Sequence, residues 1–305
     1  MIPVIPAKAT TNEGPFKEVA SIHQAPPAHW VGDGFYVQSL FSYSDAFKGA
    51  DPFVLLDFAA ERQFAPNTGA PHGVGQHPHK GFETVTIAYQ GEVSHRDSSG
   101  GGGTIQTGDV QWMTAGRGIV HEEFHSREFG QKGGPFEMVQ LWVNLPAKDK
   151  LTPAAYQAIS KEEIPVVSLP EKSGSIRLIA GTYQGQKGPA KTFTEMNVWD
   201  VQLAPSAEAL FDLPASHNLT LAVLRGQAGI NGDKSPVPSV SLVRFQPGGE
   251  RLLLQAGSEG ATILLLSGVP LNEPVVGYGP FVMNSMAEIR QAFSEYEQGK
   301  FGNIR

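Results

Sequence analysis

Short runs of β-forming residues, separated by glycine- and proline-containing turns, repeat along most of the chain and constrain its fold more than any other feature. The 35 glycines and 23 prolines are spread along 305 residues, as expected for many turns between short strands. In the first half the runs are FYVQSLFSY, PFVLLDFA, ETVTIAY, EVSHRD, DVQWMTA and FEMVQLWVNL; in the second they include IRLIAGTYQG, VWDVQLA, LTLAVLRGQAGI, SLVRFQ, RLLLQA and ATILLLSG. This spacing predicts an all-β protein made of sandwiches or barrels.

The two halves of the chain resemble each other. ETVTIAYQGEV and LTLAVLRGQAGI are both strand patterns that reach a glycine, Gly91 or Gly226, and further strand patterns follow each of them. The stretch between the halves is rich in Pro and Lys. We therefore predict two β domains of similar fold, residues 1–146 and 173–305, joined by a connecting segment at 147–172.

The end of the second half differs from the rest. Ser285 is followed three residues later by Glu288, a capping-box pattern, and Ile289, Ala292 and Phe293 then follow at helical spacing. This pattern predicts an amphipathic helix at 285–298, packed on a sheet and counted with the second domain.

Charge and composition exclude several classes of function. The net charge is −7 and no basic block occurs, so direct binding to nucleic acid is not expected. The absence of cysteine excludes disulfides and thiolate metal sites. No apolar run is long enough to span a membrane and the first residues lack a signal-peptide pattern, so the expected location is the cytoplasm.

Two histidines in QHPHKGFE raise the question of a metal site. His77 and His79 are two residues apart, so in an extended segment both imidazoles point to one face. A lone pair of this kind is more often a pair of ordinary polar residues than a metal site. In GRGIVHEEFH, however, His121 and Glu123 form a second pair with the same spacing. On neighbouring strands, the two pairs would supply three imidazoles and one carboxylate. Such a set suits Fe(II), and also Mn, Ni, Cu or Zn, and it leaves coordination positions open for substrate or oxygen.

The carboxylate of this set has two candidates. Glu123 shares the face of His121, whereas Glu122 points away from it by strand parity. Glu83 lies four residues after His79 and is a rival, so we favour Glu123 as the ligand and keep Glu83 as a pocket residue. The remaining histidines are assigned to other roles: His95 to the surface or to a hydrogen bond, His125 to support of the site, and His72 to its entrance. His217 is isolated, and no second metal site is expected in the second half.

These residues carry a family resemblance. HPHKGFETVTIAYQGEVSHRDS together with GDVQWMTAGRGIVHEEF closely resembles the pirin family, a branch of the two-domain cupins, and the C-terminal GPFVMNSMAEIRQAFSEYEQGKFG is similar to the end of a pirin. The resemblance covers nearly the whole chain. It implies a bicupin of two face-to-face antiparallel jelly-roll barrels with iron only in the first, held by His77, His79, His121 and Glu123. Glu83 also matches the general cupin pattern, in which it would be a ligand.

The resemblance implies two alternative functions. Bacterial pirins are similar to quercetin 2,3-dioxygenases, so the first is an Fe(II)-dependent dioxygenase that uses O2 to open a flavonol or a related enolisable aromatic. Glu123 would then be the general base. Independently of the resemblance, the apolar residues Phe58, Trp112 and Met113 are candidates for the substrate pocket together with Glu83, although the barrel core is the more common place for each apolar side chain. The second is an iron-dependent, redox-sensing regulator that binds a protein partner such as a transcription factor. A monomer is expected in either case.

Overall fold

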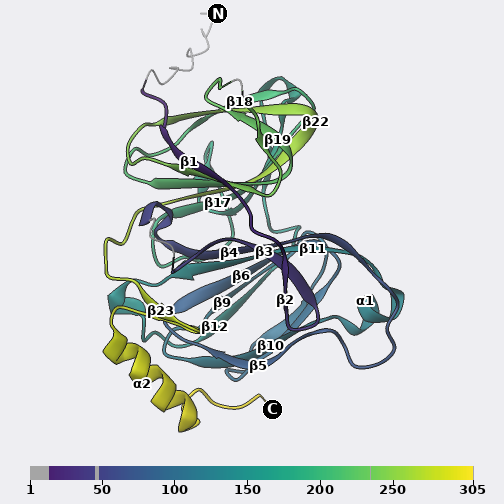
Figure 1. Ribbon diagram of the computed structural model, residues 1–305, viewed down its shortest axis with the longest axis vertical. Coiled ribbons are helices and arrows are strands. Elements are labelled where there is room, and N and C mark those ends of the chain that lie inside the picture. Colours follow the sequence, from purple (N-terminus) through teal and green to yellow (C-terminus); the bar gives the residue numbers. More distant parts are fainter. Residues whose placement is uncertain (1–13, 45–47, 234, 305) are drawn as a thin grey trace, which may run out of the picture.

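The computed structural model describes residues 14–44, 48–233 and 235–304 and confirms the predicted all-β class (Figure 1). Its strands form three main antiparallel sheets, which we call the outer, central and C-terminal sheets. The outer and central sheets come from the first half of the chain, and the C-terminal sheet comes mainly from the second half.

The first half forms a two-layer unit. The central sheet has the order β12-β9-β6-β11-β4-β3-β2 and the outer sheet the order β5-β10-β7-β8. The strands of the central sheet are β2 (His29–Val31), β3 (Phe35–Ser42), β4 (Phe53–Phe64), β6 (Phe82–Gln90), β9 (Val110–Thr114), β11 (Gly134–Asn144) and β12 (Ala155–Ile159). Those of the outer sheet are β5 (Gly73–His79), β7 (Val93–Asp97), β8 (Gly102–Ile105) and β10 (Ile119–His125).

The second half contributes the C-terminal sheet, in the order β1-β21-β19-β22-β17-β14-β13, with β18 and β20 attached to it. Its strands are β1 (Val19–Gln24), β13 (Val166–Ser168), β14 (Gly174–Ala180), β17 (Met196–Leu203), β18 (Glu208–Asp212), β19 (Asn218–Ile230), β20 (Val237–Pro238), β21 (Ser241–Phe245) and β22 (Arg251–Gly268). Two sequence runs, RLLLQA and ATILLLSG, merge into the single 18-residue strand β22, which pairs with β18, β19 and β17.

Small elements complete the fold. They are the hairpins β15 (Thr182–Tyr183)–β16 (Gln186–Lys187) and β23 (Val276–Tyr278)–β24 (Phe281–Met283), the helices α1 (Arg127–Lys132) and α2 (Met286–Glu297), and the 3-10 turns Lys48–Ala50, Ala147–Asp149 and Pro170–Lys172. Among the described residues, no helix is long and apolar enough to cross a membrane.

Both ends of the described chain cross to the other half. β1 pairs with β21 of the C-terminal sheet, although it precedes the first unit in sequence. Helix α2, capped by the Ser285 side chain, packs with β23–β24 beside the first unit, where its Ile289 joins a cluster that includes Val120 of β10 (Figure 1). The predicted domains 1–146 and 173–305 do not include these two crossings, in which β1 joins the C-terminal sheet and α2 packs beside the first unit. The connecting segment 147–172 also gives an edge strand to each half, β12 and β13.

The faces of the central sheet determine where the site lies. Because strand residues alternate between faces, one face packs against the C-terminal sheet in what we call the shared core. The shared core includes Leu56, Phe58, Val85, Ile87, Val110, Trp112, Val139 and Leu141 from the first half, and Ile179, Val198, Ala222, Leu242, Leu264 and Leu266 from the second. The opposite face looks toward the outer sheet. Part of the space between these two sheets is filled by apolar side chains, and part of it is a cavity.

Candidate metal centre

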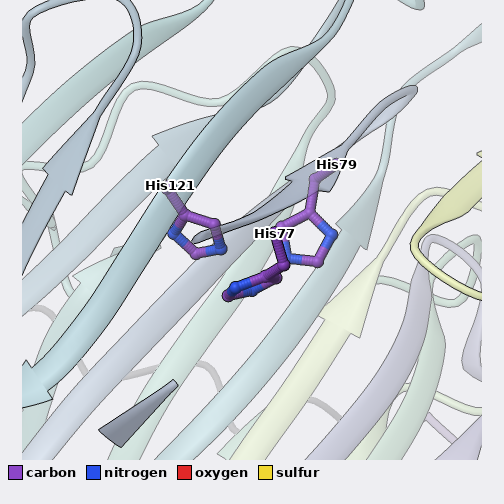
Figure 2. A group of neighbouring side chains, drawn as sticks. All are labelled: His77, His79 and His121. Carbon is purple, nitrogen blue, oxygen red and sulfur yellow. The ribbon is translucent and has the colours of Figure 1, made fainter. Parts of the chain in front are cut away.

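Three histidines of the outer sheet converge on one point. His77 and His79 come from β5 and His121 from β10, and the antiparallel register places His121 directly opposite His77. The ring centroids of His121 lie 4.3 Å from those of His77 and 4.8 Å from those of His79. Figure 2 shows the three rings directed toward one another. One ring nitrogen from each of the three lies within 4.8 Å of the other two, so the group could hold a metal ion.

The hydrogen bonds of these rings determine which nitrogen keeps a lone pair. His77 Nδ1 lies 2.8 Å from the carbonyl oxygen of Gly75, and His79 Nδ1 lies 3.2 Å from that of Pro280. A carbonyl can only accept, so each Nδ1 carries a proton and each Nε2 keeps a lone pair. His121 Nε2 is buried and has no hydrogen-bond partner among the described residues. Three clustered imidazoles, one with a buried nitrogen that has no partner among the described residues, fit a bound metal ion.

The protonation state of the rings suits this arrangement. Burial lowers the pKa of His79 and of His121 well below the ordinary value of 6.5, and the neighbouring His77 adds to the effect on both. Both imidazoles are therefore neutral at pH 7, which is the form that binds metals.

Glu123 lies beside the three histidines but is held by amides. The Gln111 side chain donates to Glu123 Oε1, and Gln140 Nε2 donates to Oε2 over 3.4 Å. Thr86 Oγ1 links the two amides, because it accepts from Gln111 over 3.0 Å and donates to Gln140 over 2.6 Å. The Glu123 carboxylate does not join the group of three imidazoles; it lies with ring nitrogens of His95 and His121 in a second potential metal-binding group.

A polar row on the central sheet supports this carboxylate. The residues that pair across successive strands on the site-facing side are Gln111, Thr86, Gln140, Asp57 and Ser39. Asp57 lies at the next strand beyond Gln140. Burial raises the pKa of Asp57, although a hydrogen bond from Ser39 opposes the shift.

His77, His79 and Glu123 line a cavity of about 370 Å³. Its other walls are largely apolar and come from β2, β3, β4, β5, β11 and the turn before β24. They are formed by Val31, Phe35, Val37, Leu55, Asp57, Val74, Met138, Gln140, Trp142, Gly279 and Pro280. Trp142 lies edge-on to His79 at 5.2 Å and stacks on Phe82 at 4.2 Å between ring centroids. The site thus combines metal-type ligands with an aromatic wall.

The four residues predicted from sequence as pocket residues do not line this cavity. Phe58 and Trp112 lie on the opposite face of the central sheet, in the shared core. Met113 is fully buried and packs with Ala115 and Ile119. Strand alternation alone could not show which face of the central sheet meets the site, because both faces carry large apolar side chains.

Glu83 also lies on the wrong face. It shares a face of β6 with Val85 and Ile87 of the shared core, whereas Thr86 reaches Glu123 from the other face. The alternation that starts at His77 does not continue into β6, because the chain turns at Gly81, whose φ is 90°. Glu83 Oε1 instead accepts a hydrogen bond from Thr114 at 2.8 Å.

The structure decides among the assignments of three further histidines. His95, assigned to the surface or to a hydrogen bond, is 1% exposed and hydrogen-bonds Asp97 and His121, so the second alternative is confirmed. His125 donates to the carbonyl of Gly34 and stacks on Phe136, within an aromatic cluster rather than at the metal ligands. His72 pairs with Asp33 at 2.9 Å and does not line the cavity.

In the second half, His217 hydrogen-bonds Ser267 at 2.9 Å and lies 3.5 Å from Glu195. Within the described residues, every group of side chains that could hold a metal lies in the first half. The corresponding interior of the second half is filled by an apolar cluster that includes Trp199, Phe211 and Leu252.

The fold and the site are those of a two-domain cupin with one candidate metal centre. Residues 34–143 match the Pirin family model and residues 198–302 match the Pirin C-terminal cupin domain. The chain belongs to the pirin family.

Individual relatives agree with this assignment. The chain is similar to a crystal structure of quercetin 2,3-dioxygenase from Acinetobacter baumannii, with 51% sequence identity, a TM-score of 0.91 and coverage of 95% of this chain and 100% of that one. It is 50% identical over 286 residues, 93% of this chain and 98% of its relative, to a Pseudomonas aeruginosa protein with the provisional name quercetin 2,3-dioxygenase. A Pirin-like protein of Solanum lycopersicum is 39% identical over 273 residues, 89% of this chain and 88% of that protein.

Proposed function

We propose that this protein is a metal-dependent dioxygenase that uses O2 to open the ring of a flavonol or a related enolisable aromatic compound. The observation that carries the proposal is the convergence of three imidazoles beside a carboxylate in a cavity with an aromatic wall. The names of the Acinetobacter and Pseudomonas relatives support the same reaction.

The ligands in this proposal are His77, His79, His121 and Glu123. Fe(II) is the proposed metal, with Mn, Ni, Cu or Zn as alternatives, because imidazole and carboxylate ligands accept all of these ions. A metal ion bound there supplies Lewis-acid and redox chemistry to a deprotonated hydroxyl group and to O2. Glu123 would complete the ligand set with its carboxylate, which Gln111 and Gln140 hold beside the imidazoles.

Glu123 is the proposed general base. Its carboxylate is the acidic group of the cavity that lies beside the imidazole cluster, and it is held by side-chain amides that can stabilise its charge. It would accept the proton of the substrate hydroxyl that is adjacent to the carbonyl. Positioned proton acceptors of this kind contribute about 10²- to 10⁴-fold to rate.

The cavity walls fit a planar aromatic body. Trp142, Phe35 and Met138 supply apolar contact, and Asp57 and Gln140 supply polar groups for further substrate hydroxyls. The volume of about 370 Å³ admits one small molecule. The cavity therefore favours a compact polyphenol over a polymer or peptide.

The test is single-substrate turnover under controlled oxygen. The protein is loaded with Fe(II) without oxygen, excess metal is removed, and quercetin and then labelled O2 are added. We expect loss of quercetin absorbance, O2 uptake and both labelled oxygen atoms in the product. Glu123→Gln should lose at least 10²-fold in rate.

Glu122→Gln is the matched control. Glu122 directly precedes Glu123 on β10, points to the other face and pairs with Arg96, so the variant should turn over like the wild type. If the wild type takes up O2 no faster than Glu123→Gln, the proposed dioxygenase activity is refuted. The regulatory role with a protein partner, the monomeric state and the cytoplasmic location stay predictions.

A further inference from the structure

A buried chain of hydrogen bonds runs from Asp97 through His95 to His121. His95 Nε2 lies 3.1 Å from Asp97 Oδ2, and His95 Nδ1 lies 3.3 Å from His121 Nδ1. Asp97 and His95 belong to β7, which pairs with β10 on the side away from β5. The three side chains are at most 4% exposed, so water does not compete with these contacts.

The donors around Asp97 determine where the proton of His95 lies. Asp97 Oδ1 accepts from the backbone N–H of Ser99 at 2.8 Å, from Ser99 Oγ at 2.6 Å and from the backbone N–H of Gly101 at 3.0 Å. The side chain is thus an ionised acceptor, and its remaining oxygen, Oδ2, faces His95. His95 must therefore donate from Nε2, and in the neutral imidazole this leaves Nδ1 as an acceptor.

The same reasoning carries the proton position to His121. Because His95 Nδ1 accepts, His121 Nδ1 donates, and the lone pair of His121 lies on Nε2. That nitrogen is buried and has no hydrogen-bond partner in the part of the chain that the structure describes. Tyr156 stacks on His95 at 4.9 Å with an interplanar angle of 16°, which holds the His95 ring in this orientation.

We propose that Asp97 and His95 are positioning residues that fix the tautomer of His121 and so present its Nε2 to the metal. The metal part of this inference rests on the proposed function. His77 and His79 are oriented by backbone carbonyls, whereas His121 is oriented through a second imidazole. Its ability to bind metal therefore depends on a carboxylate two side chains away.

Asp97→Asn tests which groups donate and which accept along the hydrogen bonds from Asp97 through His95 to His121. The asparagine oxygen would keep the hydrogen bonds from Ser99 and Gly101, so its NH2 group would face His95. His95 would then carry its proton on Nδ1, and His121 would carry its proton on Nε2, where metal should bind. We expect a loss of about 10- to 100-fold in metal affinity, as for other residues that orient metal ligands. His95→Phe keeps a ring beside Tyr156 but removes the acceptor, and we expect a similar loss.

Two variants serve as matched controls. His95→Gln has an amide N–H for Asp97 and a carbonyl oxygen for His121, so its metal affinity should stay close to that of the wild type. Ser99→Ala removes one donor to Asp97 but leaves the direction of the chain unchanged, and it should also bind normally. A purely structural role would instead lower affinity in all four variants in proportion to their loss of thermal stability.

Two readouts decide the matter without turnover. Competition of each variant with a chromophoric chelator for Co(II) gives the affinity. ¹H–¹⁵N correlation spectra of the metal-free protein, labelled at histidine, show which ring nitrogen of His121 carries the proton. We expect protonated Nδ1 in the wild type and protonated Nε2 in Asp97→Asn.

Protonated Nε2 in the wild type, or an unchanged Co(II) affinity in Asp97→Asn, would overturn the inference. Failure of the wild type to bind Co(II) at all would refute the proposed metal centre. In that case the spectra would still decide the tautomer of His121.

Discussion

A substitution of Glu83 should change the stability of the protein without changing its metal binding. Its side chain is buried against the shared core, and burial raises its pKa to about 7. The folded protein therefore holds this proton more tightly than the unfolded chain, whose pKa is near 4.5. The contribution of Glu83 to stability is fully present below about pH 4.5 and is lost as the pH rises through 7.

Glu83→Gln removes this pH-dependent loss. We expect its free energy of unfolding, measured with urea at pH 8, to exceed that of the wild type by about 3 kcal/mol, and the difference to shrink toward pH 4.5. Its metal content should equal that of the wild type, because Glu83 lies on the other face of the sheet from Glu123. Loss of metal in this variant would show that Glu83 is a ligand.

His125 titrates in the opposite sense. Burial lowers its pKa to about 4, from an ordinary value of 6.5. The unfolded chain therefore takes up the proton first, and stability is lost as the pH falls from about 6.5 toward 4. Denaturation of His125→Phe at pH 7 and pH 5 should show a smaller drop in unfolding free energy than the wild type, by about 1 to 2 kcal/mol. Equal drops in the two proteins would contradict this assignment.

Residue spacing allowed some of the site to be predicted and not the rest. The spacing of His77 and His79, and their expected position beside His121, agree with the group of three imidazoles in the structure, because the register of β5 and β10 is regular from His79 to His77. The register shifts between His121 and Glu123, and the Glu123 carboxylate does not join that group. His95 and Asp97 have the same spacing, but the residues that His95 contacts, His121 and Tyr156, lie on other strands and could not be identified from the sequence. Phe58 and Trp112 were assigned to the pocket because the apolar pattern of a sheet buried on both sides does not reveal which face meets a ligand.

The C-terminal segment is the element that closes the site. β23–β24 brings the Pro280 carbonyl to His79, and helix α2 brings Glu295 to the buried Lys80, which directly follows His79. Lys80 is 4% exposed and Glu295 19% in their side chains. Removal of one partner would leave a buried charge without compensation.

Glu295→Leu should therefore lower the free energy of unfolding by about 3 kcal/mol and weaken metal binding through His79. The double variant Lys80→Met/Glu295→Leu should recover most of that stability, because no unpaired charge stays buried. The check is a double-mutant cycle by urea denaturation, with Co(II) affinity measured on the same proteins. Additive losses in the double variant would contradict a coupled pair.

Short sequence patterns predicted which helices and strands form better than they predicted where these pack in the fold. The Ser285–Glu288 capping box indicated the C-terminal helix, and the structure has Ser285 as the N-cap of α2. Nothing local showed that α2 packs beside the first unit or that β1 joins the C-terminal sheet, since both depend on which apolar surface is left uncovered in three dimensions. Likewise, the length of β22 depends on pairing with three strands.

The two halves of the molecule share one core. Side chains of the central and C-terminal sheets interdigitate there, and the Arg225 guanidinium also pairs with the Glu137 carboxylate across the halves. A continuous core of this kind favours a single unfolding transition over two. The two-domain architecture was predictable from the repeated strand pattern, but the extent of contact between the domains was not.

Leu264→Ala tests the shared core. Leu264 is fully buried in it, so the truncation leaves a cavity and should cost about 2 to 5 kcal/mol. Thermal unfolding followed by far-ultraviolet circular dichroism and by tryptophan fluorescence should shift to the same lower temperature in both signals. Two separate transitions would indicate halves that unfold independently.

The central claim is that one metal ion is held by the imidazoles of His77, His79 and His121, and metal content tests it most directly. Wild type and His121→Ala, loaded with Fe(II) without oxygen and freed of excess metal, are compared by elemental analysis. We expect one iron per wild-type chain and little in the variant, because one of the three converging lone pairs is removed. Equal iron in the two proteins, or none in the wild type, would contradict the proposed centre.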